Sequence, residues 1–211
     1  MKKYIFRYIG YVCKIMDNWY IIILIRYCLR ESEFMREELI LVKPSRDYLE
    51  QIYEYRQEFL DNDDSMDGTS SLRRFENIEE WLQWVDKNEN EETCAKEFVP
   101  SSQFLTIRKS DNRLVGMVNI RHRLNDNLLK FGGHIGYSIR KSEREKGYAK
   151  EQLRLALLEA KKLKINKVLI TCNKDNFPSR NTILSANGVL ENELIDGEGI
   201  TQRYWINNEG I

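Results

Sequence analysis

The chain has 211 residues, 42% of them hydrophobic, and its 33 Lys and Arg residues balance its 33 Asp and Glu residues. This length suits one domain with a short appendage, and the hydrophobic content excludes a disordered chain. Zero net charge and a mean hydropathy of −0.57 argue against a basic nucleic-acid-binding protein and against an integral membrane protein.

Histidine and cysteine are scarce and scattered. The chain has two histidines and four cysteines, and neither a CxxC nor an HExxH pattern occurs, so we expect no metal site. The cysteine spacing offers no disulfide framework, which predicts a reducing compartment, the cytoplasm. The four cysteines are Cys13, Cys28, Cys94 and Cys172.

Residues 1–34 differ in composition from the remainder of the chain. They carry six basic and three acidic residues, which leaves residues 35–211 with 27 basic and 30 acidic residues. Their longest uncharged stretch, residues 18–25, is far shorter than the roughly 20 residues of a spanning helix. We expect an extension of uncertain role, upstream of a true start at Met35; association with a membrane surface is the alternative.

From Met35 onward the pattern first predicts a strand, a helix, a loop and a second helix. The apolar run 39–42 ends at Lys43-Pro44 and indicates a strand. Apolar residues spaced by three and four then predict a helix over 45–60. The acidic stretch 61–68 indicates a loop, and a second helix is expected from about residue 76 to 87.

The second half of the chain changes rhythm. Strands are predicted at 103–108, 114–122 and 133–139, and their short connections indicate an antiparallel meander. An amphipathic helix at 149–163 and an apolar strand at 167–171 follow, which predicts a right-handed βαβ unit with parallel strands. A short helix at 179–186 and a last strand at 199–206 complete the expected order.

The junction at 140–149, between a strand and a helix, has the features of a phosphate site. Gly147 can adopt backbone angles closed to other residues, and the first amides of the following helix point at whatever lies before it. The chain contains neither a P-loop nor GxGxxG. Further positive charge comes from Arg140, Lys141, Arg144 and Lys146.

Arg144-x-x-Gly147-x-Ala149 resembles the R/Q-x-x-G-x-G/A element with which the Gcn5-related N-acetyltransferases (GNAT family) wrap the pyrophosphate of acetyl-CoA. Asn176-Phe-Pro-Ser179 is similar to the family's N-x-x-A/S at the next helix start. The resemblance covers about residues 36–208, so the domain is expected to span 35–211. It implies an α/β fold with a mixed, largely antiparallel sheet and a central parallel βαβ unit flanked by helices.

The resemblance also implies how acetyl-CoA, the cosubstrate, is held. The end of the strand before the junction would pair with the pantetheine amides, the junction would hold the pyrophosphate, and the next strand-to-helix turn would contact the thiol end. The residues in these three roles are Ser138, Ile139 and Arg140; Arg144, Glu145, Lys146, Gly147, Tyr148 and Ala149; and Asn176 and Ser179.

The groups that move protons are less apparent. Many family members use a Tyr seven residues after the Asn that matches Asn176, and here that position is Ile183. A base in the family often lies on the strand before the phosphate loop, which points to His134. A hairpin centred near residue 128 would place His122 opposite His134. Tyr137 and Tyr148 are the fallback acids. For each of the two histidines and two tyrosines, a purely structural role is the alternative.

The resemblance therefore implies an acetyl-CoA-dependent N-acetyltransferase that transfers acetyl directly to a primary amine of a small molecule or peptide. The alternative, suggested by Ile183, is an acyl-CoA-binding sensor or interaction module with little catalysis. A homodimer is left open. Acidic residues of the 61–68 loop either attract a cationic amine or simply face water; they are Asp61, Asp63, Asp64 and Asp67.

Overall fold

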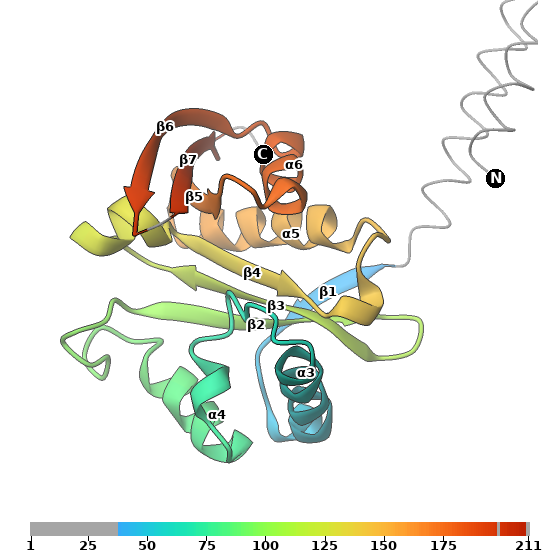
Figure 1. Cartoon of the computed structure of the whole chain (residues 1–211). Coiled ribbons are helices and arrows are strands. Elements are labelled where there is room, and N and C mark those ends of the chain that lie inside the picture. The colour runs from blue at the N-terminus through green and yellow to red at the C-terminus, as the bar shows by residue number, and fades with distance from the viewer. Residues whose placement is uncertain (1–37, 198, 210–211) are drawn as a thin grey trace, which may run out of the picture. The chain divides into compact units, whose positions relative to one another are not determined.

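The computed structural model describes residues 38–197 and 199–209, so the predictions for residues 1–34 and for a start at Met35 lie outside the described residues. Two antiparallel sheets form the framework (Figure 1). The first contains β1, β2, β3 and β4 in chain order, and the second has the order β5-β7-β6. Their bounds are β1 Leu39–Val42, β2 Ser101–Arg108, β3 Arg113–Arg121, β4 Ile135–Ile139, β5 Lys167–Asn173, β6 Val189–Asp196 and β7 Gly199–Asn207.

Helices cover both faces of the first sheet. In the view of Figure 1, α3 (Leu49–Asp61) and α4 (Ile78–Lys87) lie below it, and α5 (Tyr148–Lys162) lies above it. The short helix α6 (Phe177–Ser185) packs beside α5. One apolar core lies between α3, α4 and the lower face, and a second joins the upper face to α5, α6 and the second sheet.

The sequence of α5 explains both its position and its start. Leu153, Ala156, Leu157 and Ala160, spaced by three and four residues, are fully or almost fully buried and face the upper core. Gly147 is the residue before the first helical turn, with a φ of 86° that favours glycine. The predicted helix is therefore confirmed, and it begins where the phosphate-site motif ends.

The predicted βαβ unit differs from the structure in one respect. β4, α5 and β5 follow one another as expected, but β4 and β5 belong to different sheets. Just before β4, the His134 amide donates to the Leu169 carbonyl at 2.7 Å, and the Leu169 amide donates to His134 Nδ1 at 2.9 Å. No ladder joins the two strands over the described residues. Each strand therefore presents an open edge to the other.

Two features of the fold are absent from the sequence prediction. The strand β6 forms a hairpin with β7, and Val189, Leu190 and Ile195 are exposed on it, so it lacks the alternation that marks a half-buried strand. A π-helical turn, Leu128–Gly132, lies between β3 and β4 where a simple hairpin was expected. This turn sets the register of β4 against β3, which matters for the two histidines.

Candidate active site

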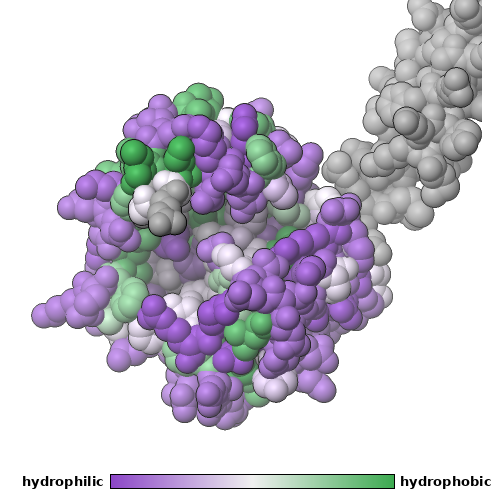
Figure 2. All heavy atoms as spheres, viewed as in Figure 1, coloured by the Kyte–Doolittle hydropathy of each residue, from purple (hydrophilic) through white to green (hydrophobic). Residues whose placement is uncertain are grey.

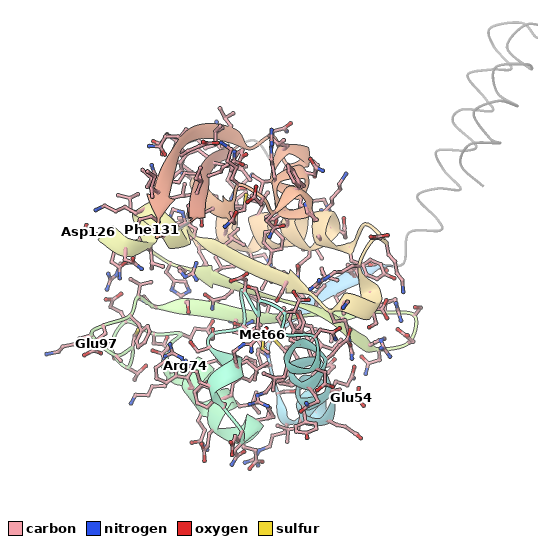
Figure 3. All side chains as sticks on the ribbon, in the orientation of Figure 1. Glu54, Met66, Arg74, Glu97, Asp126 and Phe131 are labelled. Carbon is pink, nitrogen blue, oxygen red and sulfur yellow. The ribbon has the colours of Figure 1, made fainter. Side chains whose placement is uncertain are left out.

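A cleft of about 910 Å³ lies between the open edges of β4 and β5. It appears as the hollow in the face shown in Figure 2. Its lining comes from β4, the loop before α5, the end of β5, the start of α6 and the loop between α3 and α4. Phe131, in the turn before β4, is a lining residue labelled in Figure 3. Segments far apart in the sequence thus share one cavity.

The open edge of β4 offers backbone groups to the cleft. Arg121 N donates to His134 O, and Arg140 N donates to Val115 O at the other end of the strand. In an antiparallel pair every second residue bonds to its neighbour, so Tyr137 and Ile139 direct their backbone groups to the open side. An unpaired edge of this kind can bind an extended, amide-containing chain as if it were another strand.

The loop at the far end of this edge fits an anion. The position that a Cβ on Gly147 would take has nothing within 4 Å, so the cleft is open directly above this residue. The first turn of α5, which begins at Tyr148, lies at the positive end of the helix dipole, the end toward which helix amides point. Predicted pyrophosphate residues that line the cleft are Arg144, Glu145, Gly147, Tyr148 and Ala149.

The basic side chains of this loop are engaged elsewhere. Arg144 forms an ion pair with Asp64 at 2.7 Å and donates from Nε to the Ile139 carbonyl at 2.9 Å. Lys146 forms an ion pair with Glu143 at 2.7 Å and is not among the lining residues. Burial alone would raise the pKa of Glu143, but hydrogen bonds from Lys146 and Arg108 outweigh it and lower the pKa.

Arg140 also lies outside the lining. Its side chain is buried and forms an ion pair with Glu58 of α3, on the lower face of the sheet. Glu58 also accepts a hydrogen bond from the Ser142 amide at 2.7 Å. The charged side chains of Arg140, Arg144 and Lys146 therefore brace the loop through their ion pairs.

The start of α6 forms another part of the cleft wall. The side chain of Asn176 accepts a hydrogen bond from the Ser179 amide at 3.1 Å and so caps the helix. Both residues line the cleft, and Pro178 between them suits the first turn. Their contact with the thiol end of the cofactor stays a prediction. The Asn176 cap and Pro178 thus explain why this motif stands at the start of α6.

Tyr137 brings a phenol to this same part of the wall. Its hydroxyl lies 2.9 Å from Ser179 Oγ, and its ring lines the cleft. Burial raises the pKa of Tyr137 to about 12, against the opposing hydrogen bond with Ser179. Ile183, one turn further along α6, is fully buried in the upper core. Ile183 is therefore a core residue. The hydroxyl beside the start of α6 comes from Tyr137 of β4 instead.

The predicted pairing of the two histidines is wrong. The residue opposite His134 is Arg121, because the π-helical turn shifts the register by one residue. His122 instead contacts Ser102 Oγ through Nε2 at 2.9 Å, and neither histidine is among the lining residues. Burial, followed by the charge of Arg121, lowers the pKa of His134 to about 4, so its ring is neutral at pH 7.

Sequence reasoning missed several lining residues, Arg121 among them, and underrated Asp67. Arg121, at the end of β3, was not singled out, although the strand alternation puts it on the same face as Asn119. Asp67 lines the cleft from the α3–α4 loop, and its carbonyl accepts a hydrogen bond from Ser138 Oγ. Gly68, next to Asp67, packs so closely on β4 that a Cβ at this position would lie 2.1 Å from the carbonyl oxygen of residue 136.

The cleft thus combines an open strand edge with a helix start that is preceded by a glycine. Solved structures with the same fold include a spermidine N-acetyltransferase SpeG chimera from Vibrio cholerae and hSSAT, with 17% identity, a TM-score of 0.56, and coverage of 81% of this chain and 95% of that chain. The ribosomal-protein alpha-N-acetyltransferase RimL in complex with CoA matches with 15% identity, a TM-score of 0.60, and coverage of 80% and 93%.

A third solved structure is the microcin self-immunity acetyltransferase MccE, in complex with acetyl-CoA and AMP. It matches with 19% identity, a TM-score of 0.58, and coverage of 82% of this chain and 93% of that chain. No curated protein matches this sequence.

The family described as "Acetyltransferase (GNAT) domain" matches residues 38–188. The chain therefore belongs to the GNAT family. Membership confirms the resemblance drawn from the two motifs, together with the predicted class of enzyme, an acyltransferase that uses acetyl-CoA.

Within the described residues, no helix has both the length and the apolar character needed to cross a membrane. A cytoplasmic location, a homodimer and surface association through residues 1–34 stay predictions.

Proposed function

We propose that the protein transfers acetyl from acetyl-CoA directly to a primary amine of a small molecule or peptide. The observation that carries this proposal is the continuity of the cleft. It runs from the backbone loop at Gly147, along the open edge of β4, to the Tyr137 hydroxyl beside Ser179. An acyl donor with a phosphate end, an amide-containing arm and a thioester end has these three parts in the same order.

The residues that would hold acetyl-CoA follow from this order. Backbone groups of Tyr137 and the amide of Ile139 suit the pantetheine, since the Ile139 carbonyl already accepts from Arg144 Nε, and the amides around Gly147 suit the pyrophosphate. Asn176 and Ser179 border the thioester end. When bound, acetyl-CoA supplies an acetyl group already activated as a thioester.

The acceptor reaches the thioester as an amine that must first lose a proton. Asp67 lies in the α3–α4 loop, and its charge acts on both Tyr137 and Arg121, so it stands where an incoming ammonium group would be attracted. We propose that Asp67 draws in the ammonium form and that its carboxylate and nearby water accept the proton. The amine nitrogen then attacks the thioester carbonyl, forming a C–N bond as the C–S bond breaks.

Tyr137 is the proposed general acid. Its raised pKa keeps the phenol protonated at neutral pH, so it can donate a proton to the sulfur that leaves. The nitrogen loses a second proton as the amide forms. This second proton restores the phenol through solvent, and the first leaves to water, so each turnover releases one proton. In this proposal Tyr137 fills the role left vacant by Ile183, whereas the catalytic roles of His134 and His122 stay predictions.

A CoA-binding module without efficient catalysis is the second candidate, and Ile183 is the observation that favours it. Thioester consumption against a panel of primary amines separates the two, with calorimetry of acetyl-CoA binding run in parallel. Release of one thiol for each N-acetyl product supports the enzyme. Tight acetyl-CoA binding with no thiol release from any amine supports the module.

A further inference from the structure

The guanidinium of Arg121 is held in the wall of the cleft by backbone groups. Nη1 donates to the carbonyls of Gly132 at 2.8 Å and Gly133 at 3.0 Å. Nη2 lies 3.7 Å from the position that a Cβ on Gly136 would take, so it reaches across the middle of β4. The side chain is half-buried and lines the cleft. It is a fixed cation close to the expected thioester.

Within the described ranges, no acidic side chain lies at ion-pair distance from Arg121, whereas Arg144, a second arginine of the lining, is paired with Asp64. The charge of Asp67 acts on Arg121 from further away, and burial lowers the pKa of the guanidinium. An arginine nevertheless stays protonated at neutral pH. Two of its donors are used on the turn, which leaves the rest of the fork for a ligand.

We propose that Arg121 binds a carboxylate on the acceptor, so that the preferred acceptor is an amino acid or a similar amine that carries its own carboxylate. This inference rests on the proposed function, since it names the substrate class of the same cleft. Asp67 would attract the ammonium end while Arg121 binds the carboxylate end. The two groups then orient the nitrogen toward the thioester.

The neighbourhood favours a carboxylate over a phosphate. An amino acid carries a carboxylate and an ammonium group, and these two charges match Arg121 and Asp67. A phosphate dianion, by contrast, would be repelled by Asp67. Because the carbonyls of Gly132 and Gly133 already fix the guanidinium, little side-chain freedom is lost when the ligand binds.

The test compares pairs of α-amino acids with their C-terminal amides, which differ only in the carboxylate. For the wild type, kcat/KM should be about tenfold or more higher for the acid than for the amide. Arg121→Gln should bring this ratio to about one and leave the rate on the amides within about threefold. Arg123→Gln is the matched control, because Arg123 is exposed, pairs with Glu91 at 2.6 Å and lies outside the lining; its ratio should equal that of the wild type.

Equal wild-type rates on acids and amides would overturn the inference, as would a ratio that Arg121→Gln does not change. Equal losses on both members of each pair would also overturn it, because they would assign Arg121 to the turn or to the thioester. If Arg121→Gln does not fold, Arg121→Lys keeps the charge but loses the fork, and the ratio should fall to an intermediate value.

Binding of products separates this inference from the proposed function. N-acetyl amino acids and their amides are titrated into the CoA-loaded protein by NMR, which needs no turnover. About tenfold tighter binding of the acids, lost in Arg121→Gln, supports the carboxylate site even if no amine is acetylated. Acetylation of amides and acids alike, with equal product binding, supports the enzyme and contradicts the site.

Discussion

The two ends of the cleft are constructed in different ways. At the proposed phosphate end, the backbone around Gly147 is the proposed binding group, and the basic side chains of the loop form ion pairs with Asp64, Glu143 and Glu58. At the proposed thioester end, the proposed groups are side chains from separate elements, including Tyr137 from β4. A site built from backbone groups can be recognised from one short sequence motif. A site built from side chains depends on how the fold brings distant segments together.

Gly147→Val should produce the largest effect and tests the backbone end. Valine at a φ of 86° is strained, and its side chain would occupy the open space where the pyrophosphate is expected, so the Kd for acetyl-CoA should rise about 100-fold. Calorimetry gives the Kd. Gly197→Val is the control, because Gly197 has a φ of 60° and equally open surroundings but lies outside the lining. Similar losses in both variants would show that strain, and not the site, is responsible.

Tyr137→Phe sharpens the contrast at the side-chain end. Removing the phenol should lower kcat by about 100-fold while the Kd for acetyl-CoA stays within about twofold. Because the pKa of Tyr137 is raised to about 12, the wild-type rate should not fall through loss of this proton below pH 10. Tyr53→Phe, an exposed tyrosine of α3, is the control. Near-wild-type turnover by Tyr137→Phe would remove this residue from the mechanism.

His134→Ala tests whether this histidine takes part in catalysis or stabilises the contact between the two sheets. Its Nδ1 accepts the Leu169 amide, so the free energy of unfolding should fall by about 2 kcal/mol while kcat/KM stays within about threefold. Urea denaturation and steady-state kinetics measure the two quantities. A large loss of kcat in a variant of unchanged stability would instead establish His134 as a catalytic residue.

The pH dependence of stability follows from the same group. Folding lowers the pKa of His134 from about 6.5 to about 4, so between these values the unfolded chain binds more protons than the folded one. The contribution of His134 is therefore complete above pH 6.5 and is lost as the pH falls toward 4. The free energy of unfolding, measured by denaturation at pH 4.5 and at pH 7, should differ more between these two pH values for the wild type than for His134→Ala. Equal differences would contradict the assigned cause.

Alkylation of Cys172 should give the smallest effect. The thiol lines the cleft near Ser179, and burial raises its pKa, so its reaction should be slow. Saturating acetyl-CoA should slow it by a further fivefold or so, as read from mass spectrometry of the peptide containing Cys172. Cys94, which lies outside the lining, serves as the internal reference. Equal protection of both thiols would argue against acetyl-CoA in this cleft.

The order of most strands and helices could be predicted from sequence because local periodicity determines it. The motif ending at Ala149 could be found because its function depends on backbone angles and a helix start. The position of His122 could not, since one π-helical turn shifts the register of the following strand. Tertiary packing alone brings Arg121 and Asp67 close enough for the charge of Asp67 to act on Arg121, and no local pattern marks this approach.

A crystal structure with bound CoA would test the assignment of Tyr137 and the open β4 edge most directly. The proposed mechanism predicts that the thiol sulfur lies within hydrogen-bonding distance of the Tyr137 hydroxyl. It also predicts that the pantetheine amides bond to the backbone of Tyr137 and Ile139, with the pyrophosphate over Gly147. A sulfur placed beside another side chain, with the Tyr137 hydroxyl directed away from it, would contradict the mechanism.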